Sequence, residues 1–319
     1  MPETRTDVFS NDEGNILFCA NDTYAQHMAA CIISLLENSS LSFHNIVIAG
    51  RFSSPETASK LMSLVDGNKK ASIKIVNFEP PDEVELPTRI HYTTDIYTRL
   101  WVSDFFPSDV NRVVYLDSDM IVTGDIADLW RTDLSGKMIA AVDIPGSTRN
   151  QKLGIDDAYN YFNSGVLLFD LDIWRQQKAF TTIISYIQSN IDKLIDPDQD
   201  ALNACFFKQR HTLDLRWNVI APFTWTNNEL DYSLEQCVEI VQNANIVHFN
   251  GQSKPWHFLN THPRKQDYWK YVKMSPWCDA KEEGRSFIGY IKKMYNYIVL
   301  PGPISVADAK RPNTDLPSS

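Results

Sequence analysis

The segment Val113-Val114-Tyr115-Leu116-Asp117-Ser118-Asp119 joins an apolar run to two closely spaced carboxylates. Short apolar runs rich in β-branched and aromatic residues are typical of a buried strand, so we expect a strand that ends at a pair of acids. Side chains two positions apart leave an extended chain on the same face, so both carboxylates can reach one cation. Ionised carboxylates at such a strand end repel each other unless water or a cation neutralises them. We therefore expect Asp117 and Asp119 to be metal ligands, with a solvated turn as the alternative.

A second segment, His248-Phe249-Asn250-Gly251-Gln252-Ser253-Lys254-Pro255-Trp256, offers complementary chemistry far along the chain. With the imidazole of His248, the ligands form a mixed oxygen and nitrogen set, which suits Mn²⁺ better than Mg²⁺ or thiolate-bound zinc. Gly251 lets backbone approach a ligand closely, and Lys254 can place a positive charge against phosphate oxygens. Because His248 follows the apolar pair Ile246-Val247, a hydrogen-bonded core histidine is the alternative. Together the segments predict a divalent-metal and diphosphate site, for which an activated nucleotide-sugar is the natural ligand.

Apolar runs alternate with helical patterns along most of the chain, which predicts a mostly parallel sheet covered by helices, with ligands at the carboxyl ends of the strands. The loop after the first strand, Asn21-Asp22-Thr23-Tyr24, has no glycine and so is not a dinucleotide-binding fingerprint. The expected strands are 15–20, 46–49, 73–78, 112–116, 138–142 and 165–169, and the expected helices are 25–37, 55–65, 96–105, 173–175, 180–191 and 201–207.

The pattern Asp-x-Asp occurs at three further places, and each has a simpler interpretation than metal binding. Asp170 and Asp172 precede Ile173-Trp174-Arg175, where helix capping is the better account. The overlapping pairs within 196–200 open the apolar segment 201–207, and carboxylates suit the N-terminus of a helix. Only the pair at 117 and 119 closes an apolar strand.

Bulk properties restrict the class of protein. A formal net charge of -10 argues against a general binder of nucleic acids or anionic membranes. The five cysteines form no Cys-x-x-Cys pair, so reduced thiols in a cytosolic protein are the better interpretation. The polar start lacks a signal core, and no run approaches the roughly 20 apolar residues of a spanning helix, so we expect a soluble, cytoplasmic protein.

We expect 319 residues to form one large domain with a C-terminal addition. The expected divisions are a disordered N-terminus over 1–14, a catalytic domain over 15–261, a helical extension over 262–300 and a disordered tail over 301–319. Aromatic and basic residues mix near the C-terminus, which allows weak peripheral contact with the inner face of a membrane, although a docked helix is favoured. These residues are Trp269, Tyr271, Trp277, Lys292, Lys293 and Tyr295.

Several motifs, taken in order, resemble those of the family 8 retaining glycosyltransferases, which include bacterial lipopolysaccharide galactosyl- and glucosyltransferases and glycogenin. The resemblance extends from about residue 15 to residue 257. It implies a GT-A-type fold, that is, a single Rossmann-like nucleotide-sugar-binding domain of the α/β class with a mostly parallel mixed sheet. The motifs are Phe18-Cys19-Ala20-Asn21-Asp22-Thr23-Tyr24, Tyr97-Thr98-Arg99-Leu100, Val114-Tyr115-Leu116-Asp117-Ser118-Asp119, Tyr161-Phe162-Asn163-Ser164-Gly165-Val166, Asp198-Gln199-Asp200 and His248 to Trp256.

The same resemblance implies an activity and a site. It implies transfer of galactose or glucose from a UDP-sugar, with Mn²⁺ or else Mg²⁺, to a glycan or glycolipid acceptor such as lipopolysaccharide or a surface polysaccharide. The family often has an acid where Asn21 stands, so its contact with the base is altered here or shared with Asp22. The implied nucleotide-binding residues are Ala20, Asn21, Asp22, Thr23, Ser118, Gly251 and Lys254. The implied donor-sugar residues are Arg99, Asn163, Asp198 and Gln199, of which Gln199 and Asp198 lie next to the reacting bond. The implied metal ligands are Asp117, Asp119 and His248.

Retention allows two mechanisms, of which we favour attack by the acceptor on the front face of the sugar, assisted by the departing phosphate. Double displacement needs a nucleophile on the far face, for which the Gln199 amide is poor and Asp198 is possible. Two other classes of protein remain as alternatives. One is a metal-dependent phosphohydrolase or nucleotidyltransferase, and the other is a non-catalytic glycan-binding protein, for which eight Trp and thirteen Tyr offer stacking surfaces.

Overall fold

The computed structural model describes residues 13–84, 86, 94–144, 146–224, 232–287 and 289–291 of the chain. The expected disordered tail, and all but the last two residues of the expected disordered N-terminus, lie outside these residues. The division at residue 261 stays a prediction. Among the described residues, no helix is both long and apolar enough to cross a membrane.

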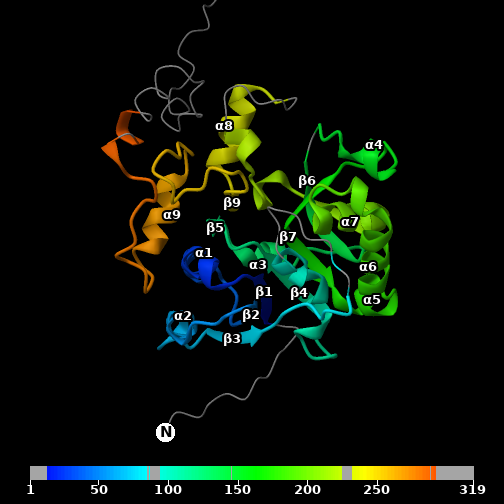
Figure 1. The fold of residues 1–319 in the computed structure, drawn as a ribbon, viewed down its shortest axis with the longest axis horizontal. Coiled ribbons are helices and arrows are strands. Elements are labelled where there is room, and N and C mark those ends of the chain that lie inside the picture. Colours follow the sequence, from blue (N-terminus) through cyan, green and yellow to red (C-terminus); the bar gives the residue numbers. More distant parts are fainter. Residues whose placement is uncertain are drawn as a thin grey trace, which may run out of the picture.

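A mixed sheet with the strand order β3-β2-β1-β4-β7-β6-β8 forms the centre of the molecule (Figure 1). β1 to β4 run parallel, β7 is antiparallel to both β4 and β6, and β8 is parallel to β6. The expectation of a mostly parallel sheet is therefore confirmed. The strands are β1 (Gly14–Cys19), β2 (His44–Gly50), β3 (Ala71–Asn77), β4 (Arg112–Leu116), β6 (Ile139–Asp143), β7 (Phe162–Asp170) and β8 (Arg210–Leu213).

Both faces of the central strands β1, β2, β4 and β7 are buried, which explains their largely apolar sequences, whereas the edge strand β3 alternates buried and exposed residues over its first half. Along β1, Ile16 and Phe18 face a cluster with α1, whereas Leu17 faces a second cluster that includes α5, α6 and α7. Figure 1 shows these three helices on one side of the sheet, with α1 and α9 on the other. The helices are α1 (Ala25–Asn38), α2 (Pro55–Met62), α3 (Ile126–Trp130), α4 (Arg149–Leu153), α5 (Leu171–Gln176), α6 (Ala179–Asn190), α7 (Pro197–Phe206), α8 (Leu234–Gln242) and α9 (Lys265–Val272).

The expected strands and helices are present within a few residues of their predicted bounds, except for one change of type. The helix expected over 96–105 is a 3₁₀ segment, Thr94–Asp104, which is interrupted at Trp101 with φ -84° and ψ 20°. The other 3₁₀ segments are short, and they connect or extend the regular elements. They are Asp22–Tyr24, Ser63–Val65, Ile191–Lys193, Phe207–Gln209, Leu215–Trp217 and Ala221–Thr224.

A second, two-stranded sheet joins segments that are far apart in sequence. β5 (Met120–Val122) pairs antiparallel with β9 (Ile246–His248), with Met120 opposite His248. Because only three residues separate β4 from β5, this pairing brings the end of β9 to the carboxyl end of β4. The short sheet thereby holds the two segments of the expected metal site together.

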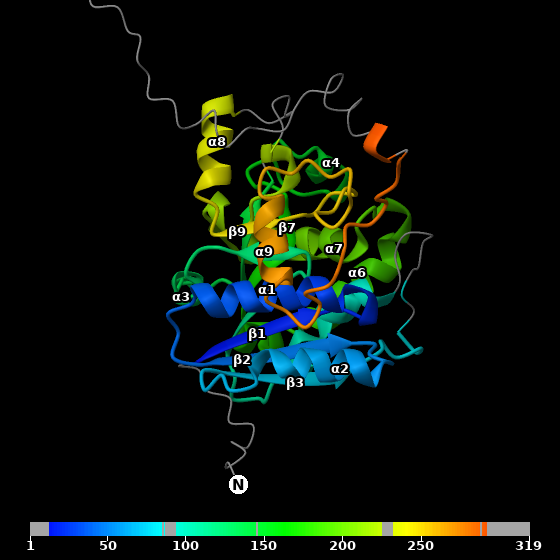
Figure 2. The same ribbon diagram turned by 90° about the vertical axis from the view of Figure 1, so that its left-hand side faces the viewer.

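The C-terminal helix α9 docks against α1, as Figure 2 shows from the side. Its aromatic residues Trp269 and Tyr271 are buried in a cluster that also contains Phe249 and Trp256. These two side chains therefore belong to the core, which favours the docked helix over membrane contact. Lys292, Lys293 and Tyr295 lie outside the described residues.

Asp170 caps α5, because its side chain accepts a hydrogen bond from the backbone N–H of Ile173. Asp172 is half exposed and lies 3.8 Å from Arg175 as a surface ion pair. We expect Asp170→Ala to lower the free energy of unfolding by about 1 kcal/mol through loss of the cap. Asp172→Ala, the matched control, should change it by less than about 0.5 kcal/mol. Urea denaturation measures both, and equal effects would contradict the capping role.

Candidate active site

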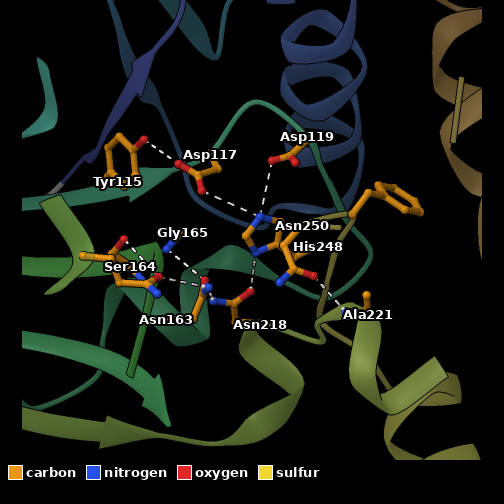
Figure 3. A network of polar contacts seen from close by, with 12 residues as sticks. Tyr115, Asp117, Asp119, Asn163, Ser164, Gly165, Asn218, Ala221, His248 and Asn250 are labelled. Atoms are coloured by element: carbon orange, nitrogen blue, oxygen red, sulfur yellow. Dashed lines mark hydrogen bonds and ion pairs between the residues drawn. The ribbon is translucent and has the colours of Figure 1, made fainter. Parts of the chain in front are cut away.

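Asp117, Asp119 and His248 offer ligand atoms that all lie within 4.8 Å of one another. Asp117 directly follows β4, Asp119 directly precedes β5, and His248 ends β9. His248 Nε2 lies 3.6 Å from Asp117 Oδ2 and 3.3 Å from Asp119 Oδ1 (Figure 3). The structure thus brings together the three predicted ligands, in a group that matches the mixed oxygen and nitrogen chemistry of a divalent-metal site.

Gly165 in β7 forms the wall behind this group. A Cβ built on Gly165 would lie 2.5 Å from His248 Cε1 and 2.8 Å from Asp117 Oδ2, closer than real Cβ contacts. The Gly165 carbonyl also accepts a hydrogen bond from the Asp117 backbone N–H at 2.9 Å. We did not single out Gly165 from the sequence as a site residue, although a glycine inside an apolar strand is a signal of close approach.

Arg99 is the central cation of the site. Its guanidinium lies 3.1 Å from Asp117 and 3.1 Å from Asp198, and it donates hydrogen bonds to the carbonyl and hydroxyl of Ser164. The Tyr115 hydroxyl donates to the Asp117 carboxylate at 2.5 Å. The orientation of Asp117 is therefore fixed from two sides by neighbouring residues.

Lys254 and Asp119 form a second ion pair, with 2.5 Å between Nζ and Oδ2. The ammonium also donates to the Phe249 carbonyl at 2.8 Å. Although burial opposes ionisation, the charge of Lys254 holds the pKa of Asp119 well below its usual range. An ammonium has three N–H donors, so Lys254 keeps one for a further acceptor such as a phosphate oxygen.

Gln199 lies in the first turn of α7, and its amide is held by several neighbours. Its Oε1 accepts hydrogen bonds from Asn163 Nδ2 at 3.1 Å, from the Ser164 backbone N–H at 2.9 Å and from the Ser164 hydroxyl at 3.3 Å. Its Nε2 donates to the Tyr161 hydroxyl, which in turn donates to Asp200. With three donors on Oε1, the carbonyl oxygen of Gln199 is fully engaged by hydrogen bonds within the protein.

Asp200 is fully buried and serves the scaffold. Arg149 of α4 pairs with its carboxylate, which also accepts the backbone N–H groups of Ile195 and Asp196. The sequence motif Asp198-Gln199-Asp200 therefore separates into an acid that faces Arg99, an amide that faces β7 and an acid that anchors the start of α7.

The first loop forms a separate group of contacts. The Asn21 side chain accepts the Thr23 backbone N–H and donates to Asp95 at 2.9 Å, and Asp95 also receives a double contact from Arg51. The Asp22 carboxylate accepts hydrogen bonds from Ser53 and from the Ser54 backbone N–H. The acid next to Asn21 is thus Asp95, whose role no local sequence pattern indicates, because the contact joins residues far apart in the chain.

The hydroxyl of one further predicted residue and the Cβ position of another lack close partners among the described residues. The Ser118 hydroxyl is buried and has no hydrogen-bond partner among the described residues. A Cβ at Gly251 would meet only Ala221 Cβ, at 3.7 Å. Packing against the described residues therefore does not require glycine at this position.

Comparison with known proteins adds to this geometry. The model of glycosyl transferase family 8 matches residues 15–260. The chain belongs to this family. It is similar to general stress protein A of Bacillus subtilis (strain 168), with 30% identity over 82% of this chain and 94% of the relative. It is also similar to a lipopolysaccharide 1,2-glucosyltransferase of Escherichia coli (strain K12), with 27% identity over 67% of this chain and 64% of the relative.

Solved structures agree on the fold of this family 8 glycosyltransferase. The galactosyltransferase LgtC, determined with donor and acceptor sugar analogues, superposes with a TM-score of 0.71 at 24% identity, covering 82% of this chain and 96% of LgtC. The glycosyltransferase GlyE of Streptococcus pneumoniae TIGR4 gives a TM-score of 0.61 at 19% identity over 95% of this chain and 66% of GlyE. The expected GT-A-type fold and the glycosyltransferase class are confirmed, and the phosphohydrolase and glycan-binding alternatives are not favoured.

Burial raises the pKa of Asp198 from 3.8 to about 6, against the opposing charge of Arg99. The protonated carboxyl therefore stabilises the folded state relative to the ionised one. This stabilisation is fully present below pH 3.8 and is lost as the pH rises through about 6. Asp198→Asn cannot ionise. In EDTA, we expect the melting temperature of Asp198→Asn minus that of wild type at the same pH to increase by about 3 °C or more between about pH 4 and about pH 8.

Calorimetric melting at several pH values measures this difference, with the exposed Asp192→Asn as the matched control. The control should show no such trend. A difference between Asp198→Asn and wild type that does not change with pH would contradict the burial of an ionising carboxyl at this position.

Proposed function

We propose that this family 8 enzyme transfers a hexose, glucose or galactose, from a UDP-sugar to a glycan or glycolipid acceptor with retention of anomeric configuration. The observation that carries this proposal is the Asp117, Asp119 and His248 group, with Lys254 next to it and Gln199 connected to it through β7. The relatives named as lipopolysaccharide glucosyl- and galactosyltransferases support an acceptor of the lipopolysaccharide or surface-polysaccharide type.

We propose Asp117, Asp119 and His248 as ligands of Mn²⁺, with Mg²⁺ as the second choice. Two carboxylates and an imidazole suit Mn²⁺, and the missing Cβ of Gly165 leaves their ligand atoms undisturbed. A divalent ion bound there supplies positive charge to the diphosphate leaving group. The remaining N–H of Lys254 adds a second positive contact on the same side.

The proposed nucleotide site combines the first loop with the segments around Ser118 and Gly251. Ala20, Asn21, Asp22 and Thr23 lie at the carboxyl end of β1, where ligands bind in sheets of this type. The contact between Asn21 and Asp95 supports a shared recognition of the base, with Asp95 compensating for the acid that Asn21 replaces. The buried, unpaired hydroxyl of Ser118 supports a contact with the nucleotide between the two acids.

The donor sugar is proposed to lie against Arg99, Asn163, Asp198 and Gln199. The three hydrogen bonds on Gln199 Oε1 withdraw its lone pairs, which disfavours this oxygen as a nucleophile. Asp198 is paired with Arg99, which also lowers its nucleophilicity. Front-face transfer needs neither residue as nucleophile: the acceptor oxygen bonds to the anomeric carbon, the bond from that carbon to phosphate oxygen breaks, and the acceptor proton passes to the departing phosphate.

The metal proposal predicts that excess EDTA abolishes transfer and that Mn²⁺ restores it better than Ca²⁺. Asp117→Asn and Asp119→Asn should each lose about 10³-fold in kcat or more, because several kcal/mol of leaving-group stabilisation disappears. Radiolabelled transfer from UDP-glucose and UDP-galactose measures both effects, with circular dichroism as a check of folding. The exposed Asp172→Asn is the matched control, and full turnover in EDTA would contradict the proposal.

Lys254 and Gln199 should contribute to different steps, Lys254 to UDP binding and Gln199 to turnover. Lys254→Ala should weaken UDP binding by about 10- to 100-fold, because it removes a charge-assisted contact to phosphate. Gln199→Ala should lower kcat on the order of 10²-fold with little change in UDP affinity, because it positions the sugar and not the nucleotide.

Calorimetric titration with UDP and steady-state kinetics measure the two effects. The exposed Lys270→Ala and Gln177→Ala are the matched controls and should behave as wild type. Equal loss of UDP affinity in Lys254→Ala and Gln199→Ala would show that the proposed division is wrong.

A further inference from the structure

We infer that Asn218 sets the tautomer of His248, so that the Nε2 atom of this histidine keeps a free lone pair toward Asp117 and Asp119. The inference rests on the proposed role of His248 as a metal ligand. Asn218 and His248 are both buried, and 2.9 Å separates Asn218 Oδ1 from His248 Nδ1. Asn218 lies between two short elements, after the 3₁₀ segment Leu215–Trp217, and no sequence motif identifies it.

The direction of each hydrogen bond follows from a group that can only donate. The backbone N–H of Gly165 contacts Asn163 Oδ1 at 2.9 Å, so the oxygen of the Asn163 amide must face it. Asn218 contacts the same oxygen at 2.7 Å, and only its Nδ2 can donate there. The Asn218 oxygen is therefore left for His248, and because a carbonyl oxygen only accepts, His248 Nδ1 must carry the proton. Figure 3 shows this row of side chains from Gly165 to His248.

A second backbone donor gives the same orientation. The Ser164 N–H donates to Gln199 Oε1 at 2.9 Å, so that oxygen faces β7 and accepts Asn163 Nδ2 at 3.1 Å. Asn163 must then present Nδ2 to Gln199 and its oxygen to Asn218. Two adjacent N–H groups of one strand thus fix the polarity of the whole row, independently of any side chain that could be turned over.

Asn218 is needed to set the tautomer because Asp117 and Asp119 favour the other one, with the proton on Nε2. Asp117 and Asp119 lie within 3.6 Å of His248 Nε2, and a carboxylate attracts a proton onto the nitrogen that faces it. A proton on Nε2 would form a hydrogen bond to these acids and occupy the lone pair that a metal needs. The acceptor on the far side of the ring, Asn218 Oδ1, counteracts this preference. Partners on the second ring nitrogen typically orient metal-binding histidines and raise their affinity for the metal.

The tautomer of His248 is directly measurable by NMR. The sample is metal-free protein labelled with ¹⁵N-histidine at about pH 8, where unperturbed imidazoles are neutral. The variant His248→Gln assigns the signal. We expect wild-type His248 to carry its proton on Nδ1. Asn218→Leu, which removes the acceptor, should move the proton to Nε2 and weaken Mn²⁺ binding by about 10- to 100-fold in a titration followed by electron paramagnetic resonance.

Two further variants separate positioning from folding. Asn218→Asp keeps an acceptor for Nδ1, so it should retain the wild-type tautomer, although it loses the donor to Asn163 and should lower stability. Asn45→Leu makes the same change at another buried asparagine, which bonds Glu13 and Asn15 at the far end of the sheet. It should lose stability without changing the tautomer of His248 or Mn²⁺ affinity.

Each outcome decides the inference. An Nε2–H signal in metal-free wild type, or an unchanged tautomer and Mn²⁺ affinity in folded Asn218→Leu, would overturn it. If Asn218→Leu does not fold, the tautomers of the wild type and of Asn218→Asp decide instead. Failure of wild type to bind Mn²⁺ would reject the proposed metal role, while the tautomer would still report whether Asn218 sets the proton position.

Discussion

The close approach of β7 to Asp117 and His248 at Gly165 is the constraint on which the site depends. A Cβ on this glycine would lie less than 3 Å from atoms of His248 and Asp117. Its backbone carbonyl and N–H each form a hydrogen bond to a residue of the site. The carbonyl accepts the Asp117 N–H, and the N–H orients Asn163. Gly165 therefore positions the backbone of Asp117 directly, and it orients His248 through the side-chain amides of Asn163 and Asn218. β7 reaches this position because it pairs with β4, to which it runs antiparallel.

Charge balance within the site follows from its burial. Asp117, Asp119 and Asp198 would repel one another in a medium that screens poorly, and the chain supplies Arg99 and Lys254 among them. The protein as a whole is acidic, so the anionic donor proposed above would gain nothing from the overall field and would depend on these local cations. Lys254 contacts Asp119 directly, so under the proposed function a metal and a phosphate that bind at the site would both change the partners of one ammonium. That side chain would then couple metal binding to nucleotide binding.

The sequence was sufficient to predict elements and chemistry, but not the contacts that orient the chemistry. The apolar run before Asp117 identified β4, and the tail after His248 indicated that this histidine lies with the two acids, as it does. β5 and β9 have three residues each, too few for a periodic signal, so their pairing could not be foreseen. Asn218 and Asp95 act through partners far away in sequence, which no local pattern encodes. The 3₁₀ segment Thr94–Asp104 was expected as an ordinary helix because both types place apolar residues at similar spacing.

The C-terminal helix belongs to this argument, because it supports the loop that carries Lys254. The Trp256 ring stacks on His27 of α1 with 3.4 Å between centroids, and Trp269 of α9 donates to the Pro255 carbonyl at 3.1 Å. Burial lowers the pKa of His27 to about 3, so this histidine stays neutral and does not repel the ammonium two residues before Trp256. Trp269 thus has a structural role that needs no membrane: together with Trp256 it holds the loop that carries Lys254 against α1.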